Sequence, residues 1–139
     1  MTMVQTAEEA NVFPDVKVAS IQMAPQIGDK AANLRRSVDL IEEAARQGAV
    51  VAVLPELANT GYVFASRQEA FALAESVPDG ESSRGWLEVA RRCKIHVVAG
   101  IAERVADRLF NAALVAGPHG YIGTYRKLHL WGDEHLFFE

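Results

Sequence analysis

Hydrophobic and polar positions along the chain predict five strands, with helical segments between the first three. The run at 50–54 (VVAVL) is entirely apolar, which is typical of a strand buried on both faces. Residues 16–22 alternate between two faces and residues 95–102 form a second apolar run, so both are predicted to be strands. The remaining two strands are predicted at 109–116 and 121–126.

A helical period separates the first two predicted strands. Apolar residues recur along one side of 31–47 and charged residues occupy the other, which predicts an amphipathic helix. Asp29 is the predicted N-cap and Gly48 the predicted end of this helix. The apolar stripe consists of Leu34, Val38, Ile41 and Ala45.

Two further helices are predicted before the strand at 95–102. One spans 67–76, and the other begins at Ser82 or Ser83 and reaches Cys93. The Gly-Pro-His-Gly turn between the last two strands has the length of a hairpin, so these strands should be antiparallel. We therefore expect an α/β fold with a mixed, mostly parallel sheet and helices on one face.

Composition and charge exclude several classes of protein. A chain of 139 residues that is 50% hydrophobic, with a net charge of −4, is expected to form one soluble globular domain. This charge does not suit nucleic acid, and the apolar runs are too short to span a membrane. The single cysteine, Cys93, excludes an intrachain disulfide and fits a reducing, cytoplasmic setting. Residues 1–15 lack the features of a signal peptide and are predicted to be a flexible N-terminal arm.

Glu56 is the first candidate for chemistry, because it follows the buried run at 50–54 almost immediately. Pro55 cannot continue a strand ladder, and open α/β sheets place their ligands at such strand ends. Partial desolvation there favours proton uptake, which suits a general base. The alternative is a loop glutamate that is held in water or paired with an arginine.

Lys127 is the second candidate, at the end of the last predicted strand. It follows Tyr125 by two positions and Gly123 by four, so the three residues point to one face. An ammonium there can pair with a carboxylate at a neighbouring strand end and stabilise a developing oxyanion. The alternative is a lysine that reaches into solvent. We predict that Glu56 and Lys127 face one cleft, close enough to pair directly or through one water.

Two segments around these candidates resemble the carbon–nitrogen hydrolase (nitrilase) superfamily. They are the segments at 54–62 (LPELANTGY) and 125–131 (YRKLHLW). Three shorter segments agree with the same family in the same order: 18–23 (VASIQM), 98–101 (VAGI) and 110–113 (FNAA). The resemblance thus covers nearly all of 16–139, with several motifs in matching structural context.

The resemblance implies the N-terminal half of a four-layer α-β-β-α sandwich that hydrolyses non-peptide C–N bonds. In that architecture the sheet face opposite the helices packs on a second sheet. The family acts through a Glu, a Lys and a Cys, so Glu56 corresponds to the general base and Lys127 to the residue that stabilises the oxyanion. A second Glu positions the substrate, and Glu134 matches it best, ahead of Asp133 and Glu139.

The family nucleophile, a cysteine, lies a few tens of residues beyond the lysine motif. We therefore expect residues 16–139 to be the N-terminal part of the domain, truncated before the nucleophile. Cys93 does not replace it, because the dipole at a helix C-terminus disfavours a thiolate, and we expect this side chain to pack. Asn59, Tyr62 and Trp131 are candidate substrate-binding residues, although a turn residue and two packing aromatics are equally plausible roles.

The function implied by the resemblance is hydrolysis of a small amide, N-carbamoyl compound or nitrile through an acyl-enzyme. The segment at 129–131 (HLW) stands where the nitrilase branch tends to show Pro-Thr, which favours amide or N-carbamoyl substrates. No metal or organic cofactor is implied. We expect a cytoplasmic homo-oligomer with a small-molecule substrate and no nucleic-acid or membrane partner. The alternative is a non-catalytic truncated homologue that only self-associates or binds. A flavodoxin-like domain is disfavoured because no phosphate-binding glycine loop follows the first strand.

Overall fold

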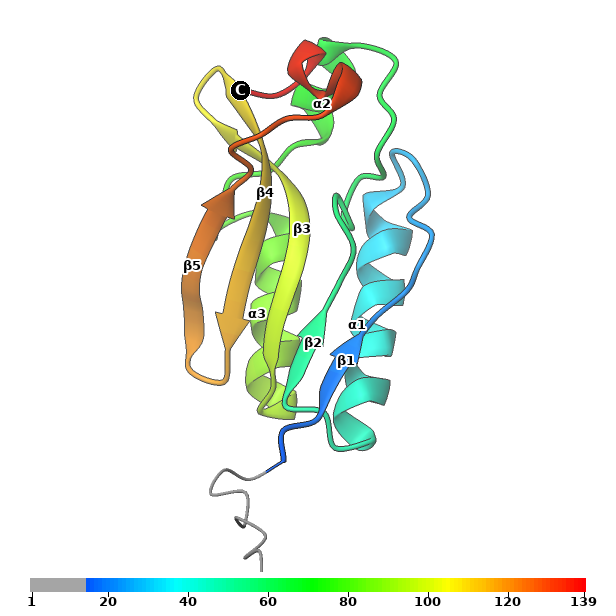
Figure 1. The fold of residues 1–139 in the computed structure, drawn as a ribbon, viewed down its shortest axis with the longest axis vertical. Helices are drawn as coiled ribbons and strands as arrows, with labels where there is room; N and C mark the ends of the chain where they lie inside the picture. The colour runs from blue at the N-terminus through cyan, green and yellow to red at the C-terminus, as the bar shows by residue number, and fades with distance from the viewer. Residues whose placement is uncertain (1–14) are drawn as a thin grey trace, which may run out of the picture.

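The computed structural model describes residues 15–139, which form a twisted sheet with helices packed along it (Figure 1). The arm predicted at 1–15 lies outside the described residues, apart from Asp15. The strand order in the sheet is β1-β2-β3-β4-β5. The strands are β1 (Val18–Ser20), β2 (Val51–Val53), β3 (His96–Val105), β4 (Arg108–Gly117) and β5 (Gly120–Arg126). The helices are α1 (Lys30–Arg46), α2 (Arg67–Leu73), α3 (Glu81–Cys93) and the 3-10 helix η1 (Gly132–Leu136).

Parallel and antiparallel pairings divide the sheet into two parts. β1 pairs with β2 and β2 with β3 in parallel, whereas the β3-β4 and β4-β5 pairs are antiparallel. The predicted mixed sheet is confirmed, but the expectation that it is mostly parallel is wrong. β3 continues to Val105 and turns back through Ala106 and Asp107 alone, a connection far too short for a parallel crossover.

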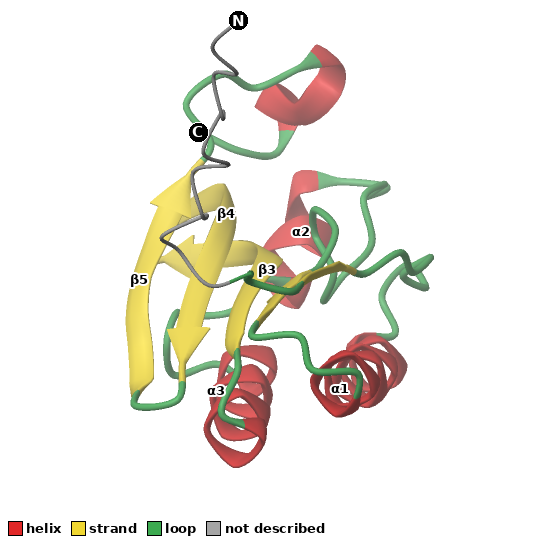
Figure 2. Ribbon diagram, turned by 60° about the horizontal axis from the view of Figure 1, so that its bottom comes forward, coloured by secondary structure: helices red, strands yellow, loops and turns green. Residues whose placement is uncertain are grey.

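Helices α1 and α3 lie side by side on one face of the sheet, as Figure 2 shows, which confirms their predicted placement. Strand residues that point toward them are buried, among them Ala52, Val97 and Leu114. Within this layer the indole N–H of Trp86 in α3 donates a hydrogen bond to the hydroxyl of Ser37 in α1 at 2.8 Å. The larger hydrophobic core of the described residues therefore lies between these two helices and the sheet.

The ends of the helices follow their capping interactions. The Asp29 carboxylate accepts a hydrogen bond from the first turn of α1 at 3.0 Å, which confirms it as N-cap. α3 was predicted to begin at Ser82 or Ser83 and begins one residue earlier, at Glu81, after the cap residue Gly80. Ser82 binds the buried Glu75 carboxylate through its hydroxyl and N–H. α2 is shorter than the predicted 67–76, because the backbone of Glu75 pairs with β3. No helix among the described residues combines the length and apolar character that a membrane-spanning segment requires.

The face of the sheet opposite α1 and α3, here called the open face, leaves large apolar side chains in contact with solvent. Val18, Val53 and Tyr125 on this face are 56%, 37% and 57% exposed. Val98 and Val115 of the two central strands are only partly buried. This is the face for which the family resemblance implies a second sheet.

Candidate active site

The position of Glu56 depends on a close crossing between the end of β2 and the middle of β3. The N–H of Leu54 still donates to the Val98 carbonyl at 2.8 Å, after which Pro55 ends the ladder. The chain then crosses over Gly100, where an added Cβ would lie 2.5 Å from the Glu56 Cα. Only glycine at this position leaves room for the turn that presents Glu56.

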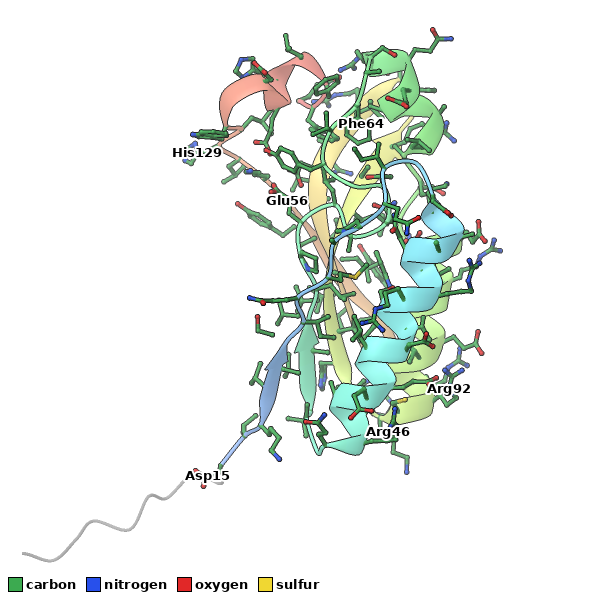
Figure 3. The ribbon with its side chains drawn as sticks, turned by 90° about the vertical axis from the view of Figure 1, so that its right-hand side faces the viewer. Asp15, Arg46, Glu56, Phe64, Arg92 and His129 are labelled. Atoms are coloured by element: carbon green, nitrogen blue, oxygen red, sulfur yellow. The ribbon has the colours of Figure 1, made fainter. Side chains whose placement is uncertain are left out.

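Lys127 follows β5 directly and reaches Glu56 over Gly100 of β3 and Asn111 of β4, two residues within the intervening strands that line the same cavity. Its Nζ donates to Glu56 Oε1 at 2.9 Å and to Glu134 Oε1 at 2.8 Å. Both Glu56 and Lys127 line one cavity of about 270 Å³ at the end of the open face. Figure 3 shows Glu56 on the opposite side of the sheet from Arg46 and Arg92 of the helices. The predicted pairing of Glu56 and Lys127 in one cleft is confirmed, and it is direct.

Glu134 is the carboxylate of the C-terminal segment that joins this pair. It lies buried in η1, whereas Asp133 is exposed and Glu139 binds Arg67 and Arg108 away from the cavity. Its Oε1 also accepts a hydrogen bond from the hydroxyl of Tyr62 at 2.8 Å, and its Oε2 accepts one at 2.6 Å from the backbone N–H of Trp131, the residue before η1. The choice of Glu134 over its two neighbours therefore agrees with the geometry.

Hydrogen bonding sets the charge states of the cluster. Burial raises the pKa of the Glu134 carboxyl, but hydrogen bonds from Lys127, a backbone N–H and Tyr62 outweigh it and lower the pKa to about 2. Hydrogen bonds to Glu134 and Glu56 raise the pKa of Lys127, which therefore stays an ammonium. Burial, followed by the hydrogen bond to Glu134, raises the pKa of Tyr62 to about 12, so its hydroxyl stays a neutral donor. The Glu56 side chain remains 41% exposed, so the expected desolvation is incomplete in residues 15–139.

Asn111 of β4 is a member of the cluster to which the sequence assigned no role. Its side chain is buried, and Nδ2 donates to Glu56 Oε1 at 2.6 Å and to Glu134 Oε1 at 2.9 Å. The sequence does mark Asn111 as unusual, because a side-chain amide within the apolar run at 109–116 requires buried hydrogen-bond partners. The identity of those partners depends on residues that are distant in the chain.

The three predicted substrate-binding residues occupy different environments. Tyr62 reaches the cluster through Glu134, as described above. Asn59 is fully buried, and its Oδ1 accepts a hydrogen bond from the Ala102 N–H at 3.1 Å, so it anchors the turn rather than lining the cavity. The Trp131 side chain is 76% exposed and lines no part of the cavity, while its backbone N–H donates to Glu134.

Cys93 and the acidic residues offer no alternative centre. Cys93 is the last residue of α3 and packs partly buried against the hydrophobic core, which confirms its predicted packing role. Among residues 15–139, no group of three or more His, Cys, Asp and Glu side chains is arranged to hold a metal ion.

Comparisons with known proteins place this arrangement in a family. A profile of the carbon-nitrogen hydrolase family matches residues 17–138. The chain is 48% identical to a nitrilase of Pyrococcus abyssi over 124 residues, covering 89% of this chain and 47% of that protein. It is 43% identical to the omega-amidase NIT2 of Danio rerio over 104 residues, covering 73% of this chain and 36% of that protein.

A solved structure shows the same fold. The CN-hydrolase superfamily protein XC1258 from Xanthomonas campestris, which carries an arsenic adduct in its active site, superposes with a TM-score of 0.80 at 27% identity. The match covers 91% of this chain and 46% of that one. The chain thus spans less than half the length of each of these three relatives. With a family match over nearly its whole length, the chain belongs to the carbon-nitrogen hydrolase family.

Proposed function

We propose that the complete protein containing this chain hydrolyses non-peptide C–N bonds of a small amide, N-carbamoyl compound or nitrile. The observation that supports this most strongly is the Lys127 ammonium, which lies within 2.9 Å of Glu56 and 2.8 Å of Glu134 at the cavity. In this proposal Glu56 is the general base and Lys127 stabilises the oxyanion. The nucleophile is a cysteine outside residues 1–139.

For an amide the reaction proceeds through an acyl-enzyme. Glu56 takes the thiol proton, and the thiolate attacks the substrate carbon, whose oxygen becomes negatively charged. Two N–H groups of Lys127 bind the carboxylates, which leaves the third available for this oxyanion. The C–N bond then breaks, and the leaving nitrogen takes the proton from Glu56. Glu56 next removes a proton from water, which attacks the thioester; the C–S bond breaks, the acid is released, and Glu56 returns the proton to the cysteine sulfur.

Glu134 contributes by fixing the other groups. Four donors surround its carboxylate: Lys127, Asn111, Tyr62 and the backbone N–H of Trp131. With so many hydrogen bonds to the protein, Glu134 positions the substrate through Lys127 and Tyr62, whose hydroxyl lies beside the cluster. This ionised anchor also explains why Lys127 keeps its charge near the cavity.

The segment after Lys127 narrows the proposed substrate class, whereas the relatives do not. The relatives include both a nitrilase and an omega-amidase. The segment at 129–131 (HLW) departs from the Pro-Thr of the nitrilase branch, so we propose an amide or N-carbamoyl substrate in preference to a nitrile. We disfavour the alternative of a homologue that only self-associates, because Glu56, Lys127 and Glu134 together form a cluster suited to catalysis.

The remaining expectations belong to the same proposal. Residues 16–139 are the N-terminal part of the hydrolase domain, and the open face packs on a second sheet formed by residues outside this chain. The exposed apolar side chains of that face support this. The complete protein is proposed to be a cytoplasmic homo-oligomer, in keeping with the family resemblance and the single cysteine.

A substrate panel tests the proposed function. Ammonia or amine release from small amides, N-carbamoyl amino acids and nitriles is measured with the complete protein, its Glu56→Gln variant and a Glu88→Gln control. Glu88 is an exposed glutamate of α3 that is far from the cavity. We expect similar turnover by the wild type and the control, and turnover at least about 100-fold slower in Glu56→Gln. Turnover by Glu56→Gln at the wild-type rate would remove Glu56 from the reaction.

A further inference from the structure

Asn111 is hydrogen-bonded to each of the three charged residues of the cluster, to two of them at the carboxylate and to Lys127 at the backbone. Its side-chain amide donates to Glu56 Oε1 at 2.6 Å and to Glu134 Oε1 at 2.9 Å. Its backbone carbonyl accepts the N–H of Lys127 at 2.8 Å. These contacts come from one buried residue of β4, an interior strand of the sheet, whereas the three charged side chains belong to segments outside the strands.

We propose that Asn111 is a positioning residue that holds the Glu56 and Glu134 carboxylates on either side of the Lys127 ammonium. This inference rests on the proposed hydrolase function and adds to it a residue that acts through the catalytic groups. Asn111 lines the same cavity as Glu56 and Lys127, and in this role its side chain fixes the distance and orientation between the base and the ammonium.

The hydrogen-bond pattern explains why an amide suits this position. Glu56 Oε1 and Glu134 Oε1 both carry negative charge. Each of these two oxygens accepts hydrogen bonds from Lys127 Nζ and Asn111 Nδ2, so donors and acceptors alternate around a closed ring of four atoms. An amide NH₂ supplies two donors without adding a charge or a titrating group. A second ammonium in its place would stabilise the ionised carboxylate of Glu56 and make it a weaker base.

The side chain of Asn111 is held more rigidly than that of Lys127. Lys127 holds its charge on a flexible four-carbon stem and cannot fix two carboxylates alone. Asn111 has a short side chain on a strand paired on both sides, with Ala102 opposite it in β3. Among residues 15–139, the hydrogen bonds of Glu56 use Oε1 alone, so the arrangement leaves Oε2 for proton transfer.

Three substitutions in the complete protein separate positioning from simple filling of space. Asn111→Leu keeps the volume and removes the donors, and Asn111→Asp keeps the shape but places an acceptor against two carboxylates. Asn111→Gln retains the donors on a longer side chain. We expect kcat to fall about 10- to 100-fold in the Leu and Asp variants, the usual effect of losing a hydrogen bond to a charged group, with KM changed much less. Part of kcat should return in Asn111→Gln.

Glu103→Gln is the matched control for stability. Glu103 is a buried polar residue of the adjacent strand β3, and its carboxylate binds Arg126 rather than the cluster. We expect this variant to unfold at a lower temperature while retaining kcat. Equal losses of kcat in Glu103→Gln and Asn111→Leu would show that any disturbance of the sheet is sufficient, and the proposal would fail.

Crystal structures of the wild type and the Asn111→Leu variant supply a readout that does not depend on turnover. We expect the Glu56 carboxylate to leave Lys127 in the variant while the strands superpose. An unchanged Glu56–Lys127 contact, or full kcat in Asn111→Leu, would overturn the proposal. A wild type that hydrolyses no substrate would refute the proposed function, and the two structures would still decide the role of Asn111.

Discussion

Lys127 Nζ lies 2.9 Å from Glu56 Oε1, although the two residues are 71 positions apart in the chain. The directions of the strands explain why Glu56 and Lys127 lie so close together. β2 is parallel to β3, and two successive antiparallel pairings make β5 run in the same direction, so β2 and β5 end at the same edge. Glu56 and Lys127 each follow one of these strand ends, which brings both to one cavity.

The Glu56–Lys127 pair should behave as one unit in catalysis. In the complete protein, Glu56→Gln or Lys127→Ala should each lower kcat by about 10²–10⁴-fold, because each removes a group that acts in the transition state. The double variant should be scarcely slower than the worse single variant. Steady-state kinetics of the three proteins would check this, and fully multiplicative losses would show that the two residues act independently.

Gly100→Ala should displace the turn that carries Glu56. The new Cβ would meet the backbone of Glu56 at 2.5 Å, so the turn must shift, and we expect a loss of stability of about 1–3 kcal/mol together with a large loss of kcat. Gly123→Ala in β5 is the matched control, because its added Cβ meets no atom within 4 Å among the described residues. Thermal unfolding and kinetics of the complete protein would compare them. Equal effects in the two variants would contradict the close-crossing argument.

Acid should destabilise the wild type through Glu134. The folded-state pKa of this carboxyl is lowered from 4.5 to about 2, so its ionised form stabilises the fold above about pH 4.5. That contribution is lost as the pH falls toward 2. Denaturant midpoints measured between pH 7 and pH 2 should therefore decline more steeply in the wild type than in Glu134→Gln. Parallel curves would show that Glu134 does not hold its charge as the geometry indicates.

The chain at 1–139, expressed alone, should associate or bind a hydrophobic dye. Its open face exposes Val18, Val53 and Tyr125, and such a surface is usually covered in a soluble protein. Light scattering and dye fluorescence would measure this. A stable, cooperatively unfolding monomer that binds no dye would contradict the two-sheet architecture. A substitution such as Val53→Lys should reduce association if the open face is responsible.

The sequence predicted the strands best where one local pattern determined them. The apolar run at 50–54 forms β2, and the ladder ends because Pro55 has no N–H to donate. The third strand was predicted to stop at 102, before charged residues that are unusual in a buried strand. The structure continues it because Glu103 finds Arg126 of β5 at 2.6 and 2.9 Å. The residues around Glu103 do not show that its partner is Arg126, so the sequence did not predict the longer strand.

Residues of the site were likewise predicted where a local pattern marked them and missed where their partners are distant in the chain. Glu56 and Lys127 were predicted because each follows a strand end and lies in a family motif. Asn111 was not, because its two acceptors come from the segments before and after it in the chain. Asn59 was a candidate substrate-binding residue with a role in the turn as the alternative, and the structure fits the alternative. The turn folds back onto β3, where the Ala58 N–H binds the Gly100 carbonyl at 2.8 Å and Asn59 is buried.

The most direct test of the central claim is mass spectrometry of the complete protein quenched in acid during turnover of an amide substrate. The account predicts one acyl group on a cysteine outside residues 1–139, and no adduct in the Glu56→Gln variant. An acyl group on Cys93, turnover without any thiol adduct, or an unchanged adduct in Glu56→Gln would contradict it.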